Sequence, residues 1–171
     1  MVDAIGALTT PKAVSLFERF GIFTEAELAS REEILYEIYV KTLQIEVSTM
    51  ISMADRQILP AVIRYATRLA DSVRSVEGVD GIGLTASVQR RRLEDVSRLL
   101  EETEAALARM KDLQDQARAM LPDYKTCAFF VKDEVVPAMK AVRRPADALE
   151  QIVDADLWPF PTYGDLMFDD V

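Results

Sequence analysis

The sequence predicts an all-α protein: an antiparallel bundle of three long helices, with short accessory helices at the N-terminus and an extended Pro/aromatic tail at the C-terminus. The 171 residues include only 6 glycines and 7 prolines, and so few helix breakers favour long helices. Apolar residues also recur every three or four positions over three long stretches, which is the helical period. Because 50% of the residues are hydrophobic, the chain can bury the core of one domain covering residues 1–171.

Two short helices are predicted within residues 10–29. Thr10 is a favourable N-cap, Pro11 suits the first helical position, and Gly21 suits the residue that follows the helix end. Thr24 and Glu27 have the spacing of a capping box, in which each side chain bonds the other residue's backbone N–H. They are expected to start a helix of one turn.

The first long helix is predicted at residues 30–76, with Ser30 and Glu33 as its capping box. Pro60 should kink it, because proline has no N–H and crowds the carbonyl of Arg56. Its polar residues form a single narrow stripe, so most of the helix surface should be covered by other parts of a protein. The stripe consists of Glu37, Lys41, Gln44, Ser48, Ser52 and Asp55.

Two charged residues of this helix fall outside the polar stripe. Glu46 and Arg56 lie on a second line, among mostly apolar neighbours. An isolated buried charge is costly, so we expect both side chains to be enclosed and either paired or hydrogen-bonded.

The second long helix is predicted at residues 85–121, after a glycine-rich turn. Its apolar residues repeat in heptads, which indicates that it packs against two neighbouring helices. One heptad position holds Val96, Thr103, Met110 and Ala117.

A third helix is predicted at residues 123–153, bent at Pro137 and broken near Pro145. It should bury the thiol of Cys127, the single cysteine of the chain.

The tail, residues 156–171, alternates prolines with the aromatic residues Trp158, Phe160 and Tyr163. Proline and the residue before it favour extended backbone. So much aromatic surface should be buried, either on the bundle itself or on a partner.

Composition excludes several classes of function. The net charge of −9 argues against a nucleic-acid surface, and the absence of histidine excludes Ser-His-Asp, Cys-His and Glu-x-x-His sites. No apolar run is long enough to span a bilayer and no secretory h-region is evident, so we expect a cytoplasmic protein without a membrane partner.

Four ordered blocks of the sequence resemble the C-terminal region of type III glutamine synthetases. They are FERFGIFTEAEL at 17–28, YVKTLQIEVSTMISMADRQILPAVIRY at 39–65, VVPAMKAVRRPAD at 135–147 and LWPFPTYGDLMF at 157–168. The resemblance covers nearly the whole chain and is weakest at residues 76–120.

The resemblance implies a parent enzyme that joins ammonia to glutamate using ATP and a divalent metal, Mg²⁺ or Mn²⁺, in stacked hexameric rings. The family's catalytic motifs are absent here, so it assigns this chain no catalytic, cofactor-binding or metal-binding residue. It implies a helical module that packs on the catalytic domain of the same polypeptide and on neighbouring subunits. The candidate interface or packing residues are Glu46, Arg56, Pro60, Trp158, Phe160 and Tyr163.

Two other interpretations remain open at this point. The chain could be a free-standing helical adaptor or dimerisation domain that uses its apolar helix and tail within a small oligomer. It could also be a histidine-free enzyme with a carboxylate site, which would need several acidic side chains to converge on one pocket. The candidates for that pocket are Glu37, Glu46, Asp55, Asp133 and Glu134.

Overall fold

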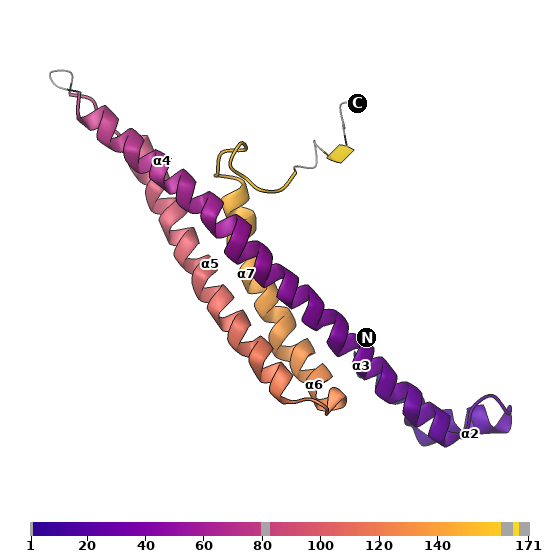
Figure 1. Ribbon diagram of the computed structural model, residues 1–171. Helices are drawn as coiled ribbons and strands as arrows, with labels where there is room; N and C mark the ends of the chain where they lie inside the picture. Colours follow the sequence, from indigo (N-terminus) through magenta and orange to yellow (C-terminus); the bar gives the residue numbers. More distant parts are fainter. Residues whose placement is uncertain (1, 80–82, 162–165, 168–171) are drawn as a thin grey trace. The chain divides into compact units, whose positions relative to one another are not determined.

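Helices make up all the regular structure in the part of the chain that the structure describes. A computed structural model describes residues 2–79, 83–161 and 166–167 (Figure 1). Within these ranges there is no β-strand, which confirms the predicted all-α class. The contacts group the chain into two compact units: unit 1 comprises Met1–Thr49 and Arg109–Met139, and unit 2 comprises Met50–Ala108 and Lys140–Val171.

The N-terminal segment of unit 1 is helical from its start. Helix α1 (Val2–Ile5) continues into a 3₁₀ turn, η1 (Gly6–Thr9), and helix α2 follows at Pro11–Arg19. The hydroxyl of Thr10 accepts the N–H of Ala13 at the start of α2, as its capping role predicted. Gly21 has φ of 63° just after α2, a conformation that suits glycine.

The long helix begins earlier than predicted. Helix α3 spans Glu25–Met53, a π-helical turn η2 spans Ala54–Ile58, and helix α4 spans Leu59–Glu77. The N-terminal cap is Thr24, whose backbone N–H donates to Glu27 at 2.8 Å while its hydroxyl accepts the N–H of Glu27. The predicted start at Ser30 is therefore wrong, because Ser30 lies inside α3. The segment between the two possible caps contains good helix formers, so the helix extends back to the earlier one.

A π turn precedes Pro60, where the sequence predicted a kink. The N–H of Leu59 donates to the carbonyl of Ala54, five residues back instead of four. In an α-helical turn, the proline ring would crowd the carbonyl group four residues back. The wider π turn moves the carbonyl groups away from the ring. Pro137 has the same arrangement, since the π turn η3 (Val131–Val135) precedes it and the N–H of Val136 donates to the carbonyl of Val131.

Helix α5 (Ser87–Ala119) buries the heptad positions that the sequence predicted. Its fully buried residues are Val96, Thr103, Leu107, Met110 and Ala117, all at most 2% exposed. The buried hydroxyl of Thr103 donates to the carbonyl of Leu99 at 2.7 Å, so this polar group is satisfied.

Helices α6 (Tyr124–Phe130) and α7 (Val136–Glu150) flank η3. The predicted break near Pro145 does not occur, because α7 continues through it. Burial of Val142, Ala146 and Leu149 on either side of this proline favours the continuous helix over a break.

Each unit has its own buried residues. In unit 1, Tyr36 is 1% exposed and its ring lies 6.2 Å from that of Phe129. The thiol of Cys127 is buried as predicted and donates to the carbonyl of Ala117 at 3.3 Å. In unit 2, the core cluster is Val62, Val96, Leu99, Leu149 and Val153.

Residues 154–158 form a turn that packs on unit 2, so the extended tail predicted from residue 156 does not begin there. The backbone N–H groups of Leu157 and Trp158 both donate to the carbonyl of Asp154. This turn places both side chains against the unit 2 core cluster. The Trp-Pro-Phe-Pro sequence, residues 158–161, begins where this turn ends, so its preference for extended backbone does not govern residues 154–157.

No helix in the described ranges is both long enough and apolar enough to cross a membrane.

Candidate interaction surfaces

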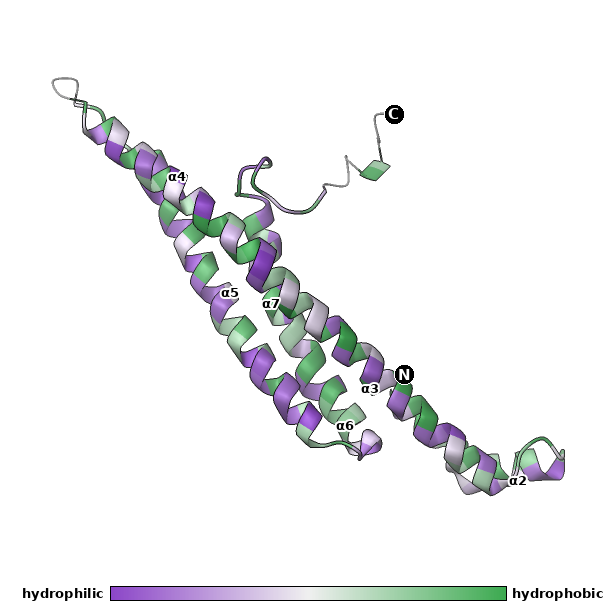
Figure 2. Ribbon diagram, viewed as in Figure 1, coloured by the Kyte–Doolittle hydropathy of each residue, from purple (hydrophilic) through white to green (hydrophobic). Residues whose placement is uncertain are grey.

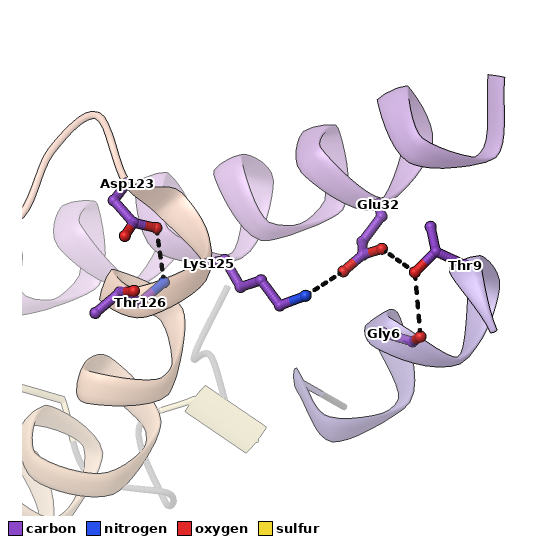
Figure 3. Close-up of polar contacts among 6 residues, drawn as sticks. All are labelled: Gly6, Thr9, Glu32, Asp123, Lys125 and Thr126. Atoms are coloured by element: carbon purple, nitrogen blue, oxygen red, sulfur yellow. Dashed lines mark hydrogen bonds and ion pairs between the residues drawn. The ribbon is translucent and has the colours of Figure 1, made fainter. Parts of the chain in front are cut away.

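A buried carboxylate ties three segments of unit 1 together (Figure 3). Glu32 of α3 is 8% exposed. One of its oxygens accepts the hydroxyl proton of Thr9 from η1, and the other accepts Nζ of Lys125 from α6 at 2.9 Å. The N-terminal turn, the long helix and α6 therefore share one polar network.

This network shifts the titration of both charged groups. The hydrogen bond from Thr9 and the ammonium of Lys125 lower the pKa of Glu32 below its ordinary value. The same carboxylate raises the pKa of Lys125. A second ion pair, Lys132 to Asp3 at 2.7 Å, holds the N-terminal segment to η3. A hydrogen-bonded carboxylate of lowered pKa is a poor proton acceptor, so this arrangement suits a structural link between the three segments.

A shallow hollow of about 290 Å³ lies beside Glu32. Its walls carry Glu33, Asp123, Tyr36 and Tyr124. Asp123 is already occupied as the N-cap of α6, where it accepts the N–H of Thr126 at 3.0 Å. Sequence reasoning missed the whole network, because its partners lie 23 and 93 residues from Glu32 and no local pattern marks them.

Three of the acidic side chains proposed for a carboxylate site have separate basic partners. Glu37 pairs with Lys41, Asp133 with Lys132, and Glu134 with Arg109 at 3.6 Å. Among residues 2–79, 83–161 and 166–167, no three His, Cys, Asp or Glu side chains are grouped so that they could hold a metal ion. The described donors therefore do not fit the divalent metal that the resemblance implies for the parent.

Glu46 and Arg56 do not lie where the sequence placed them. Both are exposed on the described surface, so the prediction that they are enclosed is wrong. Two physical reasons account for this. The chain leaves much of α3 uncovered near Glu46, and Arg56 lies inside the π turn, where a helical wheel drawn at 100° per residue loses register.

The predicted aromatic residues are partly brought together. Trp158 and Phe160 are both half-buried, and their rings meet edge to face at 6.2 Å and 78°. The indole Nε1–H of Trp158 is buried without a hydrogen-bond acceptor among the described residues. Tyr163 lies outside the described residues. Pro60 is half-buried in the first turn of α4.

An exposed apolar stripe on α3 is a candidate interface of unit 1. We define the α3 stripe as Ile34, Leu35, Ile38 and Ile45, which are 48%, 40%, 55% and 69% exposed. Ile34, Ile38 and Ile45 are separated by four and seven residues and share one helix face. Figure 2 shows hydrophobic residues along the length of α3. Exposed apolar side chains gathered on one face of a helix mark a candidate binding face.

Comparison with known proteins shows which helical domain the first part of this chain resembles. The family described as "Glutamine synthetase C-terminal domain" matches residues 1–77, which include α1 to α4 and the α3 stripe.

Three curated relatives, all glutamine synthetases, are similar to nearly the whole of this chain. The chain is 30% identical to the type-3 glutamine synthetase of Dictyostelium discoideum, 28% to the glutamine synthetase of Butyrivibrio fibrisolvens and 27% to that of Bacteroides fragilis. These alignments cover 97%, 97% and 92% of this chain. The chain spans 23%, 23% and 22% of the relatives' own lengths. The predicted resemblance to the C-terminal region of type III glutamine synthetase is therefore confirmed.

Proposed function

We propose that this chain is the non-catalytic C-terminal helical module of a type III glutamine synthetase. The parent polypeptide would make glutamine from glutamate, ammonia and ATP with Mg²⁺ or Mn²⁺. The module would pack on the catalytic domain and support assembly of neighbouring subunits.

The exposed α3 stripe is the observation that carries this proposal. Its four aliphatic side chains are about half exposed, and burying the exposed half would contribute about 3–6 kcal/mol. The stripe also lies within the residues that match the family. A large body that covers this face is what the rest of a longer glutamine synthetase would supply.

The predicted interface residues have different roles in this proposal. Glu46 lies one residue after Ile45 and is exposed, so it suits the polar rim of an interface centred on the stripe. Arg56 is exposed in the π turn and is available to a carboxylate of the catalytic domain. Trp158 and Phe160 already pack on unit 2, so they support the module itself.

The test compares the 171-residue chain with the complete reading frame that contains it. Glutamine formation is measured from glutamate, ammonia and ATP with Mg²⁺ or Mn²⁺. We expect activity from the complete polypeptide and none from this chain alone. Activity of this chain alone, or a reading frame without a glutamine synthetase catalytic domain, would overturn the proposal; the latter result would favour a free-standing adaptor.

A variant tests the interface within the complete enzyme. Ile38→Asp and Ile45→Asp together should weaken assembly or activity, because they place charges in the centre of the stripe. Arg91→Glu with Arg92→Glu is the control, because it changes two exposed α5 residues outside the stripe. Equal behaviour of both double variants and the unaltered enzyme would remove the stripe from the proposal.

A further inference from the structure

Helix α2 presents an apolar face flanked by positive charges. We define the α2 patch as Lys12, Leu16, Arg19 and Phe20. The other three each lie three or four residues from Leu16, on one side of the helix and its C-cap. Leu16 is 53% exposed and Phe20 is 66% exposed. No residue of α2 is buried, and neither Lys12 nor Arg19 forms an ion pair with another described residue.

A groove of opposite charge lies in unit 2, between α4 and α5. It has a volume of about 470 Å³ and an apolar lining. Glu101 and Glu104 lie on its α5 side and form no ion pair with another described residue. We define the α4–α5 groove by these two glutamates together with Leu59, Ile63, Leu100, Ala105 and Ala108.

The small side chains of Ala105 and Ala108 leave this groove open, and Ile63 remains 53% exposed at its edge. The hollow lies in the size range of cavities that bind ligands or protruding side chains. Its acidic side would repel an acidic segment and attract a basic one. A suitable occupant therefore combines large apolar side chains with flanking lysine or arginine.

We propose that the α2 patch of one copy docks into the α4–α5 groove of a second copy of this chain. Leu16 and Phe20 would fill the apolar groove beside Ile63. Lys12 and Arg19 would then face Glu101 and Glu104, so that four groups without ion-pair partners in the described chain become two complementary pairs. The patch and the groove thus match in both polarity and charge.

The contact would be heterologous, because the patch and the groove are different surfaces. Each pair of copies keeps one free patch and one free groove, so association continues until a ring closes or a filament forms. This inference rests on the assembly role in the proposed function and makes it specific. It concerns association of this chain alone, so it can fail while the module still packs on a catalytic domain.

Sedimentation velocity over a concentration series tests the inference with the 171-residue chain. The unaltered chain should associate, and added NaCl should weaken that association because the flanking charges are exposed. Lys12→Glu with Arg19→Glu should weaken association about tenfold or more, and so should Glu101→Lys with Glu104→Lys. Arg91→Glu with Arg92→Glu reverses two exposed charges elsewhere and should leave association unchanged.

Mixing the two charge-reversed variants gives the deciding result. One variant keeps a native groove and the other a native patch, and the two reversed surfaces also carry opposite charges. The mixture should therefore associate, although neither variant associates alone. Circular dichroism confirms that each variant is folded. The inference is overturned if the unaltered chain stays monomeric, if the mixture fails to pair, or if the control variant weakens association equally. It is also overturned if the reversals only lower the melting temperature of a monomer, because the patch would then dock within one chain.

Discussion

Replacing Trp158 by alanine should destabilise unit 2 by about 2–3 kcal/mol. Truncating a fully buried aromatic residue costs about 3–5 kcal/mol, and Trp158 is half-buried against the core cluster of Val62, Val96 and Leu99. Loss of the edge-to-face contact with Phe160 removes roughly another 0.5–1 kcal/mol. For a chain of this size, the melting temperature should fall by about 5–10 °C.

Trp158→Phe should behave differently. The indole Nε1–H is buried without an acceptor among the described residues, and an unsatisfied buried donor costs about 1–3 kcal/mol. Phenylalanine removes this donor and keeps most of the apolar contact, so the two effects should nearly cancel.

Thermal and urea unfolding, followed by circular dichroism at the helix band, measure both variants. Leu166→Ala is the matched control, because Leu166 belongs to the same tail and is 66% exposed. An unchanged melting temperature for Trp158→Ala would show that the tail does not stabilise unit 2. If Trp158→Phe were as damaging as Trp158→Ala, the indole N–H would have an acceptor and the reasoning about its cost would be refuted.

Three further predictions concern unit 1. Glu32→Gln should cost about 1–2 kcal/mol at pH 7. Because folding lowers the pKa of Glu32, its carboxylate stabilises the fold at neutral pH. That stabilisation is lost as the pH falls through the pKa of Glu32 in the folded state. In unfolding experiments at decreasing pH, the variant should therefore lose less stability than the unaltered chain. Thr24→Ala should cost about 1 kcal/mol in urea unfolding, whereas Ser30→Ala should cost almost nothing; the opposite order would mean that the helix starts at the later cap. Cys127 should not react with an aromatic disulfide reagent at pH 8 until urea unfolds the chain. Burial raises the pKa of its thiol and excludes the reagent. Rapid reaction in the native state would contradict its burial.

Several features of the fold that depend on residues close together in the sequence were predicted correctly from local sequence patterns. The heptads of α5 gave the correct buried positions, because burial repeats with the helix itself. Thr10, Pro11 and Gly21 also act as predicted, since each role depends on neighbouring backbone. The choice between Thr24 and Ser30 failed for a related reason: both have an acidic residue three positions later, and only the extent of the helix decides between them.

Other features depend on interactions that a sequence pattern does not contain. The pairing of Glu32 with Lys125 joins residues 93 positions apart. The exposure of Glu46 depends on how much of α3 the chain covers, which apolar content alone cannot give. The continuity of α7 through Pro145 depends on tertiary burial, which can outweigh the roughly 3 kcal/mol penalty of an interior proline.

In each of the two π turns, the extra residue of the turn and the proline that follows it depend on each other. Each turn holds one residue more than an α-helical turn, and each is followed at the second position by a proline, Pro60 or Pro137. Deleting Gln57 alone should return the turn to α-helical spacing and drive Pro60 against a carbonyl four residues back, whereas the same deletion combined with Pro60→Ala should be tolerated. In evolution, the extra residue and the proline would then be gained or lost together. A homologue with a one-residue gap in this turn should also lack the proline.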